Sequence, residues 1–165
     1  MSRSALGAAA LLIAAALGLA GCGDGGGGSG GESAARDTST IKAADSSLGR
    51  ILVDGSGRTL YLFTGDSQNT NAMDCDAACL RLWPPMEGRP KAGAGVDASR
   101  IGSTAAKGDK TQATYAGHPL YYYADDKSAG DVNGQGIDKI WYVLDAAGSA
   151  ITKSPKPADN GGYGY

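Results

Sequence analysis

The chain repeats itself at an offset of 60 residues, and this repeat constrains the fold more than any other feature. Residues 57–63, Gly-Arg-Thr-Leu-Tyr-Leu-Phe, correspond to residues 117–123, Gly-His-Pro-Leu-Tyr-Tyr-Tyr. Further residues recur in the same order and at nearly the same spacing: Asp66 with Asp126, and Trp83 with Trp141. A duplication of this kind predicts two units of the same local structure within one domain.

Short apolar runs separated by Asp, Gly and Ser predict strands in both copies. In the first copy, the runs over 50–53 and 59–63 flank an Asp-Gly turn, which is typical of a hairpin. The expected strands cover residues 39–44, 50–53, 59–63, 101–106, 111–115, 119–123, 140–144 and 149–152. We therefore predict an all-β domain of two related antiparallel repeats, sandwich or barrel-like in arrangement.

The ends of the chain differ in composition from this domain. Residues 23–31 hold seven glycines, so we expect a flexible tether over 22–39, and a second flexible tail over 153–165. The duplicated domain is expected over 40–152, with repeat one at about 40–90 and repeat two at about 100–152. Its one predicted helix runs from Asp74, as the cap, to Leu82, near Cys75 and Cys79.

The N-terminus predicts export. Arg3 is the one charged residue before position 22, and residues 5–20 are almost wholly apolar but fewer than the roughly 20 needed to span a bilayer. Leu19-Ala20-Gly21-Cys22 resembles the lipobox of bacterial lipoproteins. This resemblance implies cleavage after residue 21 and a diacylglycerol on the Cys22 thiol. We expect a protein anchored in the cell membrane by lipid and facing its extracytoplasmic side.

The remaining cysteines form an even pair. Once Cys22 carries lipid, Cys75 and Cys79 are left in an oxidising compartment, and on one helix they would share a face at disulfide distance. We predict an intramolecular disulfide. The alternative is a redox-active or copper(I)-binding dithiol, with Met73 and His118 as further ligands, because soft thiolates select that ion.

The two copies share a Tyr-x-aromatic-x-x-Asp motif, formed by Tyr61, Phe63 and Asp66 and by Tyr121, Tyr123 and Asp126. Alternation along a strand places Tyr61 and Phe63 on one face and leucines on the other, which predicts a buried strand. The aspartate at its end can accept turn N–H groups or a tyrosine hydroxyl. The alternative interpretation is an aromatic ligand-binding groove with two symmetry-related acids.

These motifs resemble the signature of a family of bacterial secreted-repeat lipoproteins without an established activity. The likeness includes the lipobox, the cysteine pair followed by Trp83-Pro84-Pro85, and the glycine-rich stretch from Gly130 to Trp141. It covers roughly residues 40–152. The resemblance implies a duplicated architecture and a location outside the cytoplasm, but no reaction.

Composition and the remaining motifs limit the classes of function and partner that we expect. A net charge of −2 without a basic cluster argues against nucleic acid as a partner, and we expect a monomer. His118 occupies the position of Arg58 in the other copy, and the calcium-like stretch after Asp131 has Tyr142 in place of the bidentate Glu. We predict a non-catalytic binding or structural module without a cofactor. The alternatives are a redox or copper-handling lipoprotein and a hydrolase using paired aspartates.

Overall fold

The structure is a computed structural model that describes residues 36–155. This part of the chain holds short strands joined by turns, one short helix and two single-turn 3-10 helices. The elements are β1 (Thr40–Ser46), β2 (Gly49–Asp54), β3 (Tyr61–Phe63), α1 (Ala77–Leu82), β4 (Lys91–Ala92), η1 (Ala98–Arg100), β5 (Ile101–Ala106), β6 (Lys110–Tyr115), β7 (His118–Pro119), η2 (Ile137–Lys139) and β8 (Trp141–Val143). The predicted mostly-β domain with one helix is confirmed.

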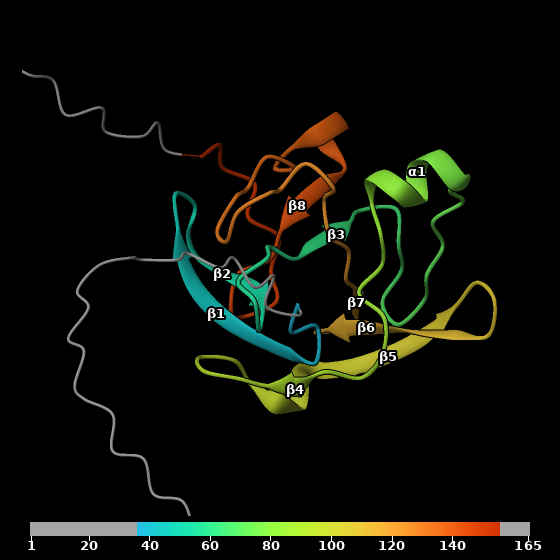
Figure 1. Cartoon of the computed structure of the whole chain (residues 1–165), viewed down its shortest axis with the longest axis horizontal. Helices are drawn as coiled ribbons and strands as arrows, with labels where there is room; N and C mark the ends of the chain where they lie inside the picture. Colours follow the sequence, from blue (N-terminus) through green and yellow to red (C-terminus); the bar gives the residue numbers. More distant parts are fainter. Residues whose placement is uncertain (1–35, 156–165) are drawn as a thin grey trace, which may run out of the picture. The chain divides into compact units, whose positions relative to one another are not determined.

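The strands form three small sheets, ordered β2-β1-β4, β3-β8 and β5-β6-β7 (Figure 1). The hairpins β1–β2 and β5–β6 are corresponding elements of the two repeats, each antiparallel over six residue pairs. The described residues form three small sheets and no closed barrel.

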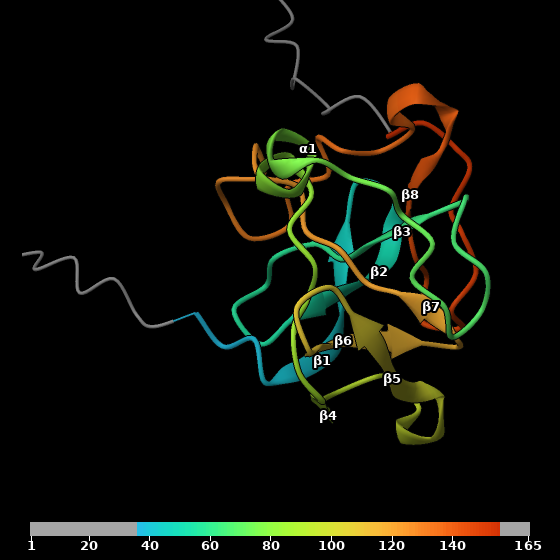
Figure 2. The same ribbon diagram turned by 90° about the vertical axis from the view of Figure 1, so that its right-hand side faces the viewer.

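The middle sheet crosses between the repeats. Strand β3 of repeat one pairs antiparallel with β8 of repeat two, and the Thr64 N–H donates to the Ile140 carbonyl at 2.9 Å. The reverse crossing has the same form, because the N–H groups of Tyr122 and Ala124 donate to the carbonyls of Pro84 and Leu82 at 2.9 and 2.8 Å. Figures 1 and 2 both show β3 beside β8. Each motif strand is therefore completed by the tryptophan segment of the other repeat.

The two crossings meet at the motif tyrosines. Tyr61 and Tyr121 form an isolated antiparallel bridge in which each N–H donates to the other carbonyl at 2.9 Å. The contacts around this bridge recur at offsets of 60 for the motif strands and 58 for the tryptophan segments. The two repeats are thus related by an approximate two-fold axis through this tyrosine pair.

Alternation along the motif strands divides the core into two clusters. Leu60, Leu62 and Leu120 lie in one cluster with Met86 and Leu144, whereas the motif aromatics lie in the other. The second cluster contains Tyr61, Tyr121, Trp83, Trp141, Val53 and Val143, with Phe63 and Tyr123 packed against it. Because both faces are covered, these strands are buried as their apolar pattern predicts.

Glycine sets the entry into each motif strand. Gly57 and Gly117 occupy corresponding turns, with φ of +89° and +83°, a region that side-chain-bearing residues rarely adopt. The Gly57 N–H donates to the Asp54 carbonyl at 2.9 Å, and the Asp54 carboxylate accepts the N–H groups of Ser56 and Arg58. The turn therefore directs the chain from β2 back along itself into β3.

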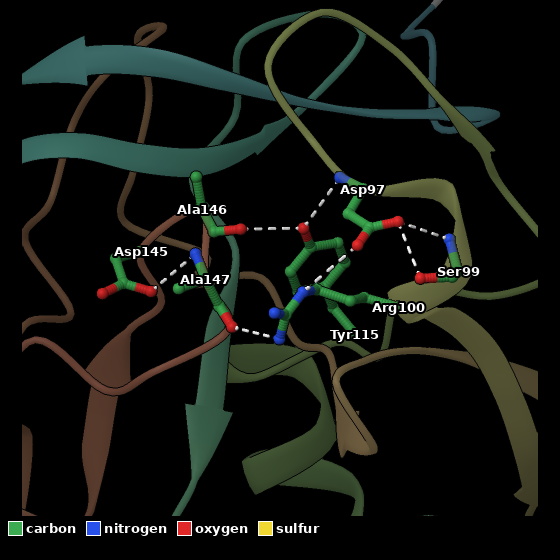
Figure 3. A network of polar contacts seen from close by, with 7 residues as sticks. All are labelled: Asp97, Ser99, Arg100, Tyr115, Asp145, Ala146 and Ala147. Carbon is green, nitrogen blue, oxygen red and sulfur yellow. Dashed lines mark hydrogen bonds and ion pairs between the residues drawn. The ribbon is translucent and has the colours of Figure 1, made fainter.

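A polar network holds the segment between the repeats against the end of repeat two (Figure 3). The Tyr115 hydroxyl accepts the Asp97 N–H at 3.2 Å and donates to the Ala146 carbonyl at 2.9 Å. Arg100 donates to the Ala147 carbonyl at 2.8 Å and pairs with the Asp97 carboxylate at 3.6 Å. These bonds position η1, from which β5 begins.

Three local predictions need correction. Helix α1 begins at Ala77, and its N-cap is Asp76 rather than Asp74, because the Asp76 carboxylate accepts the N–H groups of Ala78 and Cys79. Residues 149–152 form no strand; Ala150 makes a single bridge to Leu144 after a tight turn. The strand predicted over 119–123 is interrupted, since β7 ends at Pro119 and Tyr121 pairs with two different partners.

The predicted signal peptide, lipidated Cys22, most of the tether and most of the C-terminal tail lie outside the described residues. Within residues 36–155, no helix has the length and apolar character needed to cross a membrane.

Candidate functional site

The motif tyrosine of repeat one bonds to the motif aspartate of repeat two. The Tyr61 hydroxyl donates to Asp126 Oδ2 at 2.7 Å and accepts the N–H of Gly134 at 3.2 Å. The other carboxylate oxygen of Asp126 accepts the Asn133 N–H at 2.9 Å. Asp126 is only 5% exposed, so this pair lies within the core.

The reciprocal pair joins Tyr121 of repeat two to Asp66 of repeat one. The Tyr121 hydroxyl donates to Asp66 Oδ2 at 2.7 Å, and Asp66 Oδ1 accepts the Ala72 N–H at 2.7 Å. Asp66 is half-buried, in contrast to Asp126. We call these two contacts the crossed Tyr–Asp pairs. Each aspartate binds both a turn N–H and a tyrosine hydroxyl, and in each case the tyrosine belongs to the other repeat.

Burial and the aspartates keep both tyrosines protonated. Burial first, and then the neighbouring Asp126 charge, raise the pKa of Tyr61 far above its usual value. Burial and the hydrogen bond to Asp66 do the same to the pKa of Tyr121. Burial also raises the pKa of Asp126, against the effect of its hydrogen bonds from Tyr61 and Asn133. Both hydroxyls therefore act as hydrogen-bond donors at neutral pH.

The two tryptophans stack on each other between the crossed pairs. The rings of Trp83 and Trp141 lie 3.8 Å apart between centroids and are almost parallel, at 2°. Tyr61 meets Trp83 edge-on at 5.5 Å, and Tyr121 meets Trp141 edge-on at 5.3 Å. The outer faces are covered by the third motif residue of the opposite repeat, Tyr123 on Trp83 and Phe63 on Trp141. This cluster thus obeys the same approximate two-fold symmetry.

Gly134 closes the cluster from the glycine-rich stretch. A Cβ at this position would lie 2.8 Å from the Trp83 ring and 2.9 Å from the Tyr61 ring. Only glycine lets the backbone approach closely enough for its N–H to reach the Tyr61 hydroxyl. The stretch that resembles a calcium loop therefore packs, through Gly134, against the rings of Trp83 and Tyr61. Asp131 within it accepts the N–H groups of Lys127 and Ser128.

Cys75 and Cys79 lie at disulfide distance, with Cα atoms 5.3 Å apart. Cys75 precedes the helix cap, so the two cysteines do not share a helix face as predicted, and a disulfide between them would join α1 to the chain before it. Both cysteines and Met73 line a cavity of about 350 Å³, together with both tryptophans.

The remaining predicted copper ligand is not part of this group. His118 lies half-buried in β7, paired with Tyr115, and does not line the cavity at the cysteines. Among residues 36–155, no three His, Cys, Asp or Glu side chains cluster closely enough to hold a metal ion. The structure thus places Met73 with the cysteine pair and His118 elsewhere.

A second cavity, of about 310 Å³, lies between the chain before α1 and the β5–β6 hairpin. Its apolar wall includes Met73, Leu80 and the ring of Tyr121, and its polar residues include Lys107 and Lys110. Lys110 pairs with Glu87 at 2.6 Å, and Lys107 lies 3.4 Å from the carboxylate of Asp74. Motif aromatics therefore line both cavities, Tyr121 this one and Phe63 the one at the cysteines.

The sequence predicted that a motif aspartate can accept a tyrosine hydroxyl, but it did not predict that the tyrosine belongs to the other repeat. Each repeat holds one tyrosine donor and one aspartate acceptor, so pairing within a repeat and pairing between repeats satisfy the same groups. One feature of the sequence pointed to pairing between the repeats: the motif strand is apolar on both faces. A strand buried on both faces needs neighbours that one repeat of about 45 residues cannot supply.

The fold and these contacts define a class of β protein in which two tandem repeats complete each other through crossed strands and crossed polar pairs. The chain belongs to the lipoprotein family described as a secreted repeat of unknown function, whose model matches residues 42–87 and 103–145. The resemblance inferred from the motifs is thereby confirmed. Comparison with curated proteins and with solved structures gives no match.

Proposed function

We propose that this protein is a non-catalytic binding or structural module, held outside the cytoplasmic membrane by lipid on Cys22. The motif that defines its repeats serves to lock the two halves together. The surface of the locked domain then carries any binding role. Membership of a secreted lipoprotein family supports the location, and the lipobox supports the site of attachment.

The crossed Tyr–Asp pairs carry this proposal. A catalytic carboxylate must reach a substrate, whereas both oxygens of Asp126 and both oxygens of Asp66 accept hydrogen bonds from the domain itself. The tyrosine partners are fully buried. Each carboxylate oxygen thus accepts one hydrogen bond from the domain itself, and bonds of this kind stabilise a fold.

Asp66→Asn and Asp126→Asn test the role of the motif. A lock predicts that each variant loses stability, by about 1–3 kcal/mol, because a charge-assisted hydrogen bond to a buried hydroxyl is weakened. Urea unfolding of the full chain carrying Cys22→Ser measures this loss. Variants that are as stable as the parent, or more stable, would indicate carboxylates held for catalysis and would contradict the proposal.

Cys22→Ser tests the anchor. We expect the variant to leave the membrane fraction or to accumulate as an uncleaved precursor, since the lipidated thiol is missing. The matched control is the Cys75→Ser/Cys79→Ser chain, which should stay in the membrane fraction. Normal processing and unchanged membrane attachment of the Cys22→Ser chain would contradict lipid anchoring.

The copper or redox alternative keeps one supporting observation, the shared cavity of Met73, Cys75 and Cys79. Titration of free thiols in freshly isolated protein separates the two functions. A pair that resists mild reductant supports the structural disulfide. Easy reduction, followed by tight copper(I) uptake that the double Cys→Ser chain lacks, would favour the alternative.

A further inference from the structure

A third cavity, of about 480 Å³, carries an unusual number of cations. It opens between the chain before β1, the turn before β3, α1 and the segment after Tyr121. Its lining includes four cations, Arg36, Arg58, Arg81 and Lys127, together with Tyr122 and Asp126. We propose that this cavity binds the phosphate group of a phosphate ester. The inference deepens the binding role proposed above and rests on it.

The charge around the cavity is strongly unbalanced. Four cationic side chains line it against one carboxylate, and that carboxylate, Asp126, is already bonded to Tyr61 and Asn133. Lys127 is partly engaged, with its ammonium 3.4 Å from Asp125 and 2.6 Å from the Ala124 carbonyl. The three arginines form no ion pair within residues 36–155. An anion is the ligand that this set of charges favours.

Buried donors without partners lie at the same place. Tyr122 is 4% exposed and lines the cavity, yet its hydroxyl has no hydrogen-bond partner among the described residues. The same holds for Nε of Arg58, whose guanidinium lies over the Tyr122 ring at 4.2 Å from the centroid. Buried polar groups in native proteins are almost always paired. An acceptor within the cavity would satisfy the Arg58 donor, and the Tyr122 hydroxyl could be shared between that acceptor and Asp54.

The Asp54 carboxylate neighbours the Tyr122 hydroxyl and competes with any ligand for its proton. Asp54 is fully buried, does not line the cavity, and accepts the N–H groups of Ser56 and Arg58 through Oδ1. Its Oδ2 is buried without another partner, so it is the acceptor within the protein for the Tyr122 hydroxyl. Burial first, and then the Asp54 charge, raise the pKa of Tyr122. The hydroxyl therefore keeps its proton and remains a donor at neutral pH.

Arginine points to phosphate rather than to a smaller anion. The planar guanidinium presents paired N–H groups that match phosphate oxygens, and several of them can share the oxygens of one phosphate. Pro84, Pro85 and Ala124 add an apolar wall that suits the carbon part of an ester. Two sources have this chemistry, a soluble phosphate ester and a phospholipid headgroup.

The position of the cavity makes both sources accessible. Arg36 is fourteen positions after Cys22, so a lipid at Cys22 keeps the cavity within about 50 Å of the membrane surface even if the chain is fully extended. A headgroup and a soluble ester can therefore compete for the same arginines. The two sources are distinguished by the choice of probe.

The test uses the full chain carrying Cys22→Ser, so that a failure of lipid anchoring leaves it unaffected. The soluble probe is glycerol 3-phosphate, followed by calorimetry, and the membrane probe is cosedimentation with phosphatidylglycerol vesicles. The cavity variant is Arg36→Gln/Arg81→Gln, which changes two exposed side chains. The matched control is Arg50→Gln/Arg89→Gln, which changes two exposed arginines away from the cavity.

We expect at least tenfold weaker binding for the cavity variant and a change below twofold for the control. Binding of glycerol 3-phosphate indicates a soluble ligand, and binding to vesicles alone indicates a headgroup. Absence of binding to both probes, or equal losses in cavity variant and control, would overturn the proposal.

Discussion

The two repeats use the same motif under different conditions of burial. The pair of Tyr61 with Asp126 lies in the core and gains a third member, the N–H of Gly134. The pair of Tyr121 with Asp66 lies at the edge, with a half-buried carboxylate. Identical chemistry in symmetric positions is therefore expected to contribute different amounts of stability. The surrounding loops, rather than the motif, set the difference.

The segments before the tryptophans differ as well. Repeat one carries a capped helix and a cysteine pair there, whereas repeat two carries a glycine-rich loop and one 3-10 turn, η2. Each segment ends at a tryptophan, and the two tryptophans stack on each other. Two local structures can thus serve one tertiary role when the residue they position is the same.

The largest effect is expected from removing a motif tyrosine. Tyr61→Ala and Tyr121→Ala should each lose about 3–5 kcal/mol, because both side chains are fully buried between the stacked rings and the crossing strands. Urea unfolding of both variants measures the loss. A shift under about 1 kcal/mol, which is typical of surface changes, would show that the tyrosine lines a groove rather than the core.

The aspartates give a sharper comparison of the repeats. Asp126→Ala should cost up to about 3 kcal/mol, since it leaves the Tyr61 hydroxyl without an acceptor in the core. Asp66→Ala should cost about 1 kcal/mol, because water can reach the freed Tyr121 hydroxyl at the edge. Equal losses in urea unfolding would show that burial does not distinguish the two pairs.

The cysteine pair belongs to repeat one alone, and its predicted disulfide should stabilise that repeat. Cys75→Ser/Cys79→Ser should remain folded and lose about 2 kcal/mol, the chain-entropy value for so short a loop. Thermal unfolding with and without reductant measures this loss, and intact mass should show two fewer protons in the unreduced parent. A parent whose melting temperature does not respond to reductant would argue against a stabilising role.

The smallest expected effect is a pH dependence that comes from Asp126. Burial raises its pKa in the folded state above the model-peptide value of 3.8, so between these two pKa values the folded state binds more protons than the unfolded state. This contribution to stability is therefore lost as pH rises from about 4 through the folded pKa. Asp126→Asn should abolish it.

The difference in unfolding free energy between parent and Asp126→Asn isolates this contribution. Hydrogen bonds from Ser39 and Ser99 lower the pKa values of Asp37 and Asp97, which gives a dependence of opposite sign. Both groups are present in the two proteins, so their effects cancel. A difference that grows in favour of the parent as pH rises would contradict the assignment.

The sequence predicted the local elements better than it predicted which strands and side chains pair with one another. Hairpins β1–β2 and β5–β6 followed from turn residues and apolar runs, and the buried motif strand from its two apolar faces. The helix cap was misplaced by two residues because Asp74 and Asp76 have the same capping chemistry, and only the backbone path selects between them. The crossed pairs could not be predicted, since partner choice between identical motifs depends on tertiary geometry.

The crossing of β3 with β8 has a consequence for the order of events after synthesis. Tyr61 pairs with Val143, so the first motif strand lacks its partner until nearly the whole domain has left the export machinery. Pairings this distant in sequence are slow to form. We expect the emerging chain to remain incompletely folded through translocation and to acquire its structure in a single late step on the far side of the membrane. On this expectation, the domain folds only once its second repeat has been released.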